Sequence, residues 1–118
     1  MLSRKNRFHG RKGINSVYKY GENFNLNNIS LRILKRNSYE GRVAVVVSKK
    51  INKSAVVRNK MRRRIYEVVR TLKPRLNGNY DMVINVYNEA VYDMKFEDLA
   101  ILIEDVFIKA GCLTDRKS

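Results

Sequence analysis

The sequence predicts an α+β fold, in which helices pack against a sheet. Three observations support this class: an alternating segment at 28–36, a continuous apolar run at Val43–Val47, and an amphipathic stretch at about 55–72. Alternation favours a strand with one buried face, and an unbroken β-branched run favours a central strand buried on both faces. A repeat of about 3.6 residues favours a helix.

The chain has the size of one domain. Its 118 residues contain no repeat and no linker-like segment, so 1–118 is expected to form one domain, with 1–10 and 112–118 as flexible ends.

The N-terminal third predicts a helix and then strands. Residues 11–20 read as a short helix, and Gly21 is expected to end it in the left-handed conformation. In 28–36 the apolar face is Ile29, Leu31 and Ile33, and a turn is expected at 38–41. The opposite face carries Ser30, Arg32, Leu34 and Arg36.

The remainder predicts a long helix, a strand and a last helix. The long helix covers about 55–72, before Pro74, with a core stripe of Val57, Met61, Ile65, Val68 and Leu72. The face opposite to this stripe holds Arg58, Asn59, Arg62, Arg63, Tyr66 and Arg70. A turn at 77–79 leads to a strand at 80–87, and Asp93 is expected to cap a helix at 94–110. The core stripe of this last helix is Phe96, Leu99, Ile103 and Phe107.

The charge of the chain points to a polyanionic partner. The formal net charge is +14, and residues 1–76 hold 21 of the 25 basic side chains but 3 of the 11 acidic ones. Such an excess repels itself unless a polyanion lies nearby, so nucleic acid is expected, with an anionic membrane surface as the alternative. The binding surface is expected in the first two thirds of the chain.

One segment concentrates this charge. Eight of the sixteen residues at 49–64 are basic and none is acidic. A solvated helix face usually mixes both signs, because Glu–Lys pairs stabilise a helix, so phosphate binding is the better interpretation. Arginine can bond phosphate through two N–H groups, and Asn59 adds an amide. Aromatic residues that could stack on unpaired bases, or belong to the core instead, are Phe8, Tyr18, Tyr20, Tyr66 and Tyr87.

The sequence offers no site for chemistry by the protein itself. His9 is the only histidine, and Cys112 is the only cysteine, so no intrachain disulfide can form and a reducing cytoplasm is expected. The pairs Glu97-Asp98 and Glu104-Asp105 are interpreted as solvated surface, and no spacing indicates a metal site. No segment approaches the ~20 apolar residues that cross a membrane.

The central segment resembles the signature of the bacterial ribonuclease P protein family. The resemblance consists of Val43 to Ser48, then Lys49-Lys50, and then the helix start Ala55-Val56-Val57-Arg58-Asn59-Lys60-Met61-Arg62-Arg63. Asn6-Arg7-Phe8, Val17-Tyr18 and Gly21 also match, and the likeness extends over about 5–110.

This resemblance implies a fold, an activity and partners. The fold is a two-layer α/β sandwich of order αβββαβα, with about four strands, three helices and a left-handed βαβ crossover, which would add a short strand near 22–26. The implied function is that of the protein subunit of ribonuclease P. An RNA subunit, with Mg²⁺ bound to the RNA, removes the 5′ leader of precursor tRNA. No obligate protein partner and no membrane partner are expected.

The resemblance also assigns residues. Contacts to the catalytic RNA are expected from Lys49, Lys50, Lys53, Arg58, Asn59, Lys60, Arg62 and Arg63. The leader is expected in a cleft between the sheet and the Arg-Asn helix, with Phe8, Arg11, Tyr18, Arg32 and Tyr66 as candidates. Three positions depart from the family pattern: Lys60 replaces an arginine, Ile14 an aromatic residue, and Tyr87 a basic one.

Two alternatives share some of these features. A ribosomal or other structural RNA-binding protein would have the same charge and fold class, and the Ala-Val-x-Arg-Asn motif separates the two. A basic helix on a membrane surface fits less well, because the apolar stripe of 55–72 is needed for the core.

Overall fold

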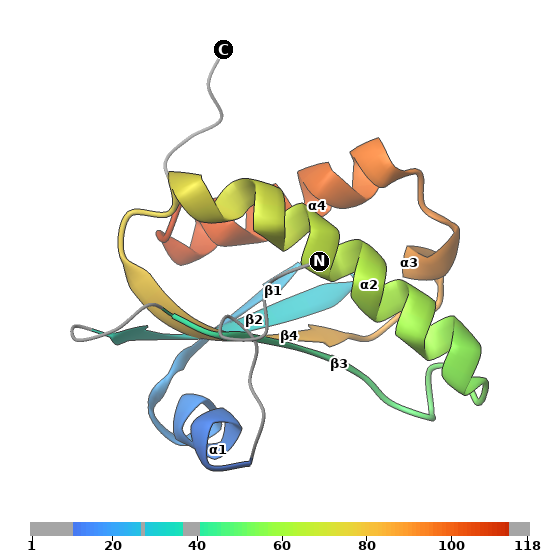
Figure 1. The fold of residues 1–118 in the computed structure, drawn as a ribbon, viewed down its shortest axis with the longest axis horizontal. Coiled ribbons are helices and arrows are strands. Elements are labelled where there is room, and N and C mark those ends of the chain that lie inside the picture. The colour runs from blue at the N-terminus through green and yellow to red at the C-terminus, as the bar shows by residue number, and fades with distance from the viewer. Residues whose placement is uncertain (1–10, 27, 37–40, 114–118) are drawn as a thin grey trace.

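The computed structural model of the chain describes residues 11–26, 28–36 and 41–113 (Figure 1). In chain order its elements are α1 (Arg11–Tyr20), β1 (Glu22–Leu26), β2 (Ile29–Arg36), β3 (Val43–Val47), α2 (Ala55–Leu72), a 3₁₀ helix (Lys73–Arg75), β4 (Asn79–Val86), α3 (Ala90–Asp93) and α4 (Phe96–Ala110). This arrangement confirms the α+β class and the predicted short strand near 22–26. The short helix α3 was not predicted.

The four strands form one mixed sheet in the order β1-β2-β4-β3. β2 pairs antiparallel with both β1 and β4, whereas β3 runs parallel to β4, and α2 connects these two strands. The expectation of a central strand at Val43–Val47 is therefore wrong, because β3 lies at an edge of the sheet. Its apolar run reflects cover on both faces and says nothing about the number of neighbouring strands.

The two faces of the sheet are covered unequally. Figure 1 shows α2 and α4 across one face and α1 against the other. The larger core lies under α2 and α4, where the odd-numbered residues of β2 and β3 point. On the opposite face the buried cluster among the described residues is small, with Val17, Ala44 and Val83, so α1 leaves much of that face open.

α2 has the predicted bounds, and its first turn shows why it begins there. Ser54 is its N-cap, and the Ser54 side chain accepts a hydrogen bond from the Val57 N–H at 3.3 Å. Met61 and Ile65 are fully buried, as the stripe predicted. Tyr66 is also buried, and its hydroxyl accepts a hydrogen bond from the Val45 N–H at 3.1 Å. The predicted exposed position of Tyr66 is therefore wrong, because the core covers more of the helix than the narrow stripe.

The helix ends correct two further expectations. Gly111 ends α4 with φ of 82°, but no positive φ occurs at Gly21. A Cβ at Gly21 would lie 2.5 Å from the Val17 carbonyl oxygen and 2.8 Å from that of Ile33, so glycine is required there by close packing. Asp93 does not cap α4; it ends α3, and Lys95 occupies the N-cap position.

Glu104 is a further correction. It was expected at the solvated surface, yet it is 8% exposed, and its carboxylate accepts a hydrogen bond from Arg75 at 2.6 Å. None of the described helices is long and apolar enough to span a membrane.

Candidate nucleic-acid interface

The basic loop and the start of α2 lie at one end of the strands, beyond the C-terminal ends of β3 and β4. β3 and β4 run parallel and pair as far as Val47 and Val86, so the segments that follow these two strands leave the sheet at the same end. Lys49, Lys50 and Lys53 are all exposed in the loop after β3. The sequence-predicted cations of this loop are therefore free to meet a polyanion.

Arg58 has a structural role within this loop. One of its terminal nitrogens donates to the carbonyl oxygens of Asn52 and Lys53, each at 2.9 Å. The Asn52 side chain in turn accepts a hydrogen bond from the Ser54 N–H at 2.8 Å. Arg58 thus holds the loop against the first turn of α2, and only part of its guanidinium faces outward.

The remaining predicted positions of α2 point outward. Asn59, Lys60 and Arg63 are exposed, and Arg62 is half-buried and donates a hydrogen bond to the Asn59 amide oxygen. We call the following set the basic α2 surface: Lys49, Lys50, Lys53, Arg58, Asn59, Lys60, Arg62 and Arg63.

Arg64 belongs to the same basic run but serves the fold. Its guanidinium donates to the carbonyl oxygens of Val91 at 3.3 Å, Tyr92 at 2.8 Å and Met94. It therefore ties α2 to the segment that contains α3. The sequence alone does not separate this arginine from its neighbours, because its carbonyl partners are about 30 residues away in the chain.

The open face of the sheet carries a second polar cluster beside α1. The Arg32 guanidinium lies 5.1 Å from the centre of the Tyr18 ring and donates to the Tyr18 carbonyl at 3.4 Å. The Tyr18 hydroxyl donates to the Asn85 side-chain oxygen at 3.2 Å. Tyr18 remains 39% exposed. We call Tyr18, Arg32 and Asn85 the Tyr18 cluster.

Polar side chains continue from the Tyr18 cluster toward the end of the strands where the basic loop lies. Ser30 is fully buried and donates to the Tyr87 hydroxyl at 3.0 Å, and the Tyr87 side chain is 59% exposed. Asn85 was not among the residues predicted from the sequence. A polar residue inside the apolar run of β4 was the signal that could have revealed it.

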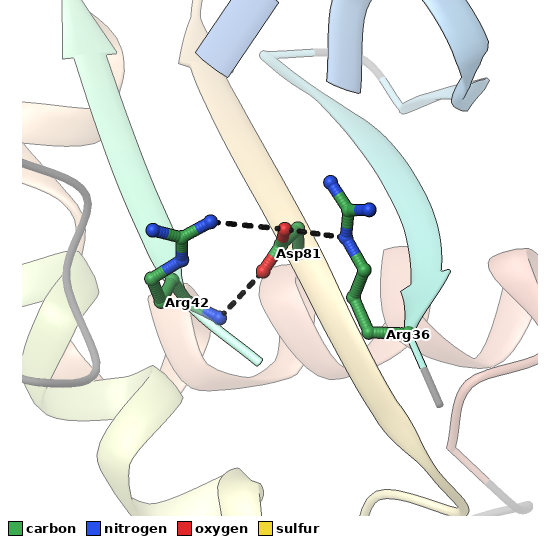
Figure 2. Close-up of polar contacts among 3 residues, drawn as sticks. All are labelled: Arg36, Arg42 and Asp81. Carbon is green, nitrogen blue, oxygen red and sulfur yellow. Dashed lines mark hydrogen bonds and ion pairs between the residues drawn. The ribbon is translucent and has the colours of Figure 1, made fainter. Parts of the chain in front are cut away.

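A buried carboxylate organises the other end of this face. Asp81 is fully buried and accepts hydrogen bonds from Arg36 Nε at 2.8 Å and from the Arg42 N–H at 3.0 Å (Figure 2). The Arg42 guanidinium also lies 3.5 Å from the same carboxylate. Asp81 therefore joins the ends of β2, β4 and β3, and this role was not predicted from the sequence.

The other residues predicted to contact the leader are either buried or outside the described part of the chain. Phe8 lies outside the described residues, and so does the side chain of Arg11. Tyr66 is buried and cannot contact a leader. The larger core fills the space between the sheet and α2, so the expectation of a cleft at that place is wrong. The open surface of the sheet is the face beside α1.

The sequence predicts that the protein has no metal site and an idle thiol. No group of three or more His, Cys, Asp or Glu side chains that could hold a metal occurs among the described residues. Cys112 is buried, and burial raises its pKa to about 12, so its thiol stays protonated at neutral pH. His9 lies outside the described residues.

A model of the family described as Ribonuclease P matches residues 2–111. The chain is 34% identical to the ribonuclease P protein component of Symbiobacterium thermophilum over 108 residues, covering 91% of this chain and 92% of the relative. It is 31% identical to that of Pseudanabaena over 114 residues, covering 96% and 97%.

The chain belongs to the ribonuclease P protein family.

Solved structures of the family show the same fold. The Staphylococcus aureus ribonuclease P protein superposes with a TM-score of 0.80 at 22% identity, covering 92% of this chain and 98% of that one. The Thermotoga maritima protein gives 0.74 at 20% identity, covering 85% and 94%.

Membership in the family sets the biochemical role. A ribonuclease P protein component is a subunit of a metal-dependent ribonucleoprotein endonuclease that processes tRNA, and the RNA performs the catalysis. This role agrees with the predicted accessory subunit of an RNA enzyme. Ribonuclease P RNA is therefore the partner of this chain.

Proposed function

We propose that this subunit uses two surfaces for two RNAs. The basic α2 surface binds the ribonuclease P RNA, and the Tyr18 cluster holds the single-stranded 5′ leader of precursor tRNA. The protein thereby assists removal of the leader and formation of the mature 5′ end. The Tyr18 cluster carries the proposal, because it combines an exposed ring, a guanidinium and an amide on an open sheet face.

Each component of the Tyr18 cluster suits a single strand. An exposed aromatic ring stacks on unpaired bases with little preference for sequence. Arg32 lies against the Tyr18 ring and is half-buried, so its charge is held in place beside the stacking position. Such a site would tolerate the different leaders of different precursor tRNAs.

The basic α2 surface suits a folded RNA. Most of its side chains are cations in an exposed loop and on a helix face, and contacts of this kind bind phosphates with little sequence specificity. Lys49 follows β3 and Tyr87 follows β4, and these two parallel strands end on the same side of the sheet. The two RNAs would therefore lie side by side. The protein would then position the leader relative to the catalytic RNA.

Metal and location complete the proposal. We place Mg²⁺ on the RNA subunit, since both surfaces bring cations rather than clustered carboxylates among the described residues. We place the protein in the cytoplasm, where precursor tRNA is processed in bacteria.

Reconstitution tests the proposal. The purified protein is added to a bacterial ribonuclease P RNA at low magnesium, with precursor tRNA carrying either a long leader or a leader of one nucleotide. We expect faster cleavage at the mature 5′ end than with RNA alone, a larger gain for the long leader, and no cleavage by protein alone.

Arg32→Ala should remove the extra gain of the long leader and leave the gain of the short leader unchanged. Lys35→Ala is the matched control, because Lys35 is exposed on the same strand but belongs to the other face. Equal losses in both variants, or an Arg32→Ala variant that still distinguishes the leaders, would contradict a leader site at the Tyr18 cluster.

A further inference from the structure

An open hollow lies between α2 and the start of α4, away from the Tyr18 cluster. Its volume is about 360 Å³, and its lining residues are Lys60, Arg63, Arg64, Glu67 and Phe96. The four residues from α2 are spaced three, four and seven apart, so they form one stripe on the helix surface. The hollow thus continues the basic α2 surface toward α4.

Phe96 is the unusual member of this lining. The sequence predicts it in the core stripe of α4, but the structure leaves it 42% exposed, whereas Leu99, Ile103 and Phe107 are fully buried. It occupies the first position of the helix, one turn before the core begins. A phenylalanine ring that faces cations across a hollow offers a stacking surface.

The other charged groups of the hollow are engaged elsewhere. Arg64 donates to three backbone carbonyls and fixes the segment that leads to Phe96. Glu67 accepts two hydrogen bonds from Arg70, at 3.1 Å and 2.5 Å, and these bonds hold the pKa of Glu67 well below its usual range. Lys60 and Arg63 remain exposed. The Lys60 ammonium lies 5.9 Å from the centre of the Tyr92 ring.

We infer that this hollow binds one unpaired nucleotide of the ribonuclease P RNA, with its base stacked on Phe96 and its phosphate beside Lys60 and Arg63. The phosphate belongs on the α2 side, because Glu97 and Asp98 are exposed in the first turn of α4 and repel it there. This inference rests on the proposed RNA-binding role of the basic α2 surface and extends that surface by an aromatic contact.

Binding of the full-length protein to a bacterial ribonuclease P RNA, without precursor tRNA, tests the inference. Phe96→Ala should weaken binding about 5- to 150-fold, the range expected for the loss of one base–aromatic stack. Phe96→Trp should restore affinity. The matched control is Ile101→Ala, which removes another exposed apolar side chain from α4 and should change affinity less than about twofold.

The salt dependence separates stacking from charge. Phe96→Ala should leave the slope of log affinity against log salt unchanged, whereas Arg63→Ala should lower it by about 0.7 to 0.9. Phe96→Leu keeps an apolar side chain without a ring and covers the case in which Phe96→Ala unfolds the protein.

The outcomes are distinct. Wild-type affinity for Phe96→Leu, or equal losses in Phe96→Ala and Ile101→Ala, would overturn the nucleotide site while the proposed function stands. If the wild-type protein itself failed to bind the RNA, the proposed function would fail, and the nucleotide site with it.

Discussion

The basic α2 surface and the Tyr18 cluster differ in how their side chains are held. In the basic α2 surface, the lysines are exposed in the loop before α2 and in the first turns of the helix. In the Tyr18 cluster, Tyr18, Arg32 and Asn85 contact one another and span α1, β2 and β4. The first surface should therefore respond to change in small, additive, salt-dependent steps, whereas the second should respond sharply to single substitutions.

The largest expected effect removes the support beneath the basic α2 surface. Ile65→Ala should lower the free energy of unfolding by about 2–5 kcal/mol, because Ile65 is fully buried under α2 and its loss leaves a cavity. Urea denaturation measures this change. Val56→Ala, at a side chain that is 73% exposed on the same helix, should cost less than about 0.5 kcal/mol. Similar costs for both would mean that the described position of α2 is wrong.

A second substitution would break the sheet face on which the Tyr18 cluster lies. Asp81→Ala removes a fully buried carboxylate that accepts hydrogen bonds from Arg36 and Arg42. Hydrogen bonds to charged groups contribute about 1.5–3 kcal/mol each, so we expect a loss of about 3 kcal/mol in denaturation experiments. Glu67→Ala removes an exposed pair with Arg70 and should cost much less than Asp81→Ala. A loss below 1 kcal/mol for Asp81→Ala would count against its organising role.

The third prediction concerns the stacking ring itself. Tyr18→Ala should weaken binding of a single-stranded leader by about 1–3 kcal/mol, and Tyr18→Phe should restore most of the affinity. Titration of a fluorescent leader oligonucleotide against the complex of protein and ribonuclease P RNA measures the effect. A Tyr18→Phe variant as weak as Tyr18→Ala would show that the hydroxyl contact to Asn85 matters more than the ring.

The smallest effects belong to single cations of the basic α2 surface. Arg62→Ala should reduce the slope of log affinity against log salt by about 0.7 to 0.9, without changing stability, since its side chain contacts only Asn59 among the hydrogen bonds described. Arg58→Ala should reduce the slope and also destabilise the loop at 49–53, because Arg58 donates to two of its carbonyls. Equal thermal stability of the two variants would argue against that loop contact.

The sequence predicts most of the fold because local patterns determine it. The bounds of α1, β3 and α2 agree with the predicted ranges, and the alternation in β2 places Arg32 on the open face as expected. The position of β3 at a sheet edge could not be predicted, since pairing depends on distant segments. Burial of Tyr66 escaped the helical pattern for the same reason: the covering strand is about twenty residues away in the chain.

The candidate interface was predictable as a set of cations but not in its internal roles. Arg58, Arg63 and Arg64 look alike in the sequence, yet Arg64 bonds to carbonyls around residues 91–94 while Arg63 is exposed. Phe96 satisfied the core spacing of α4 but lies one turn outside the core. These distinctions depend on which segments meet in space, which the order of residues does not reveal.

The hydrogen bond between the Tyr66 hydroxyl and the Val45 N–H also has a consequence for association between molecules. An exposed strand edge offers unpaired N–H and C=O groups to a strand of another chain and so promotes aggregation. On β3 the Val45 N–H is already occupied, and on β1 the Asn25 carbonyl accepts a hydrogen bond from Lys109 at 2.8 Å. Both outer strands are thereby partly closed to an incoming strand. This should reduce strand pairing between copies of the protein that have no RNA bound.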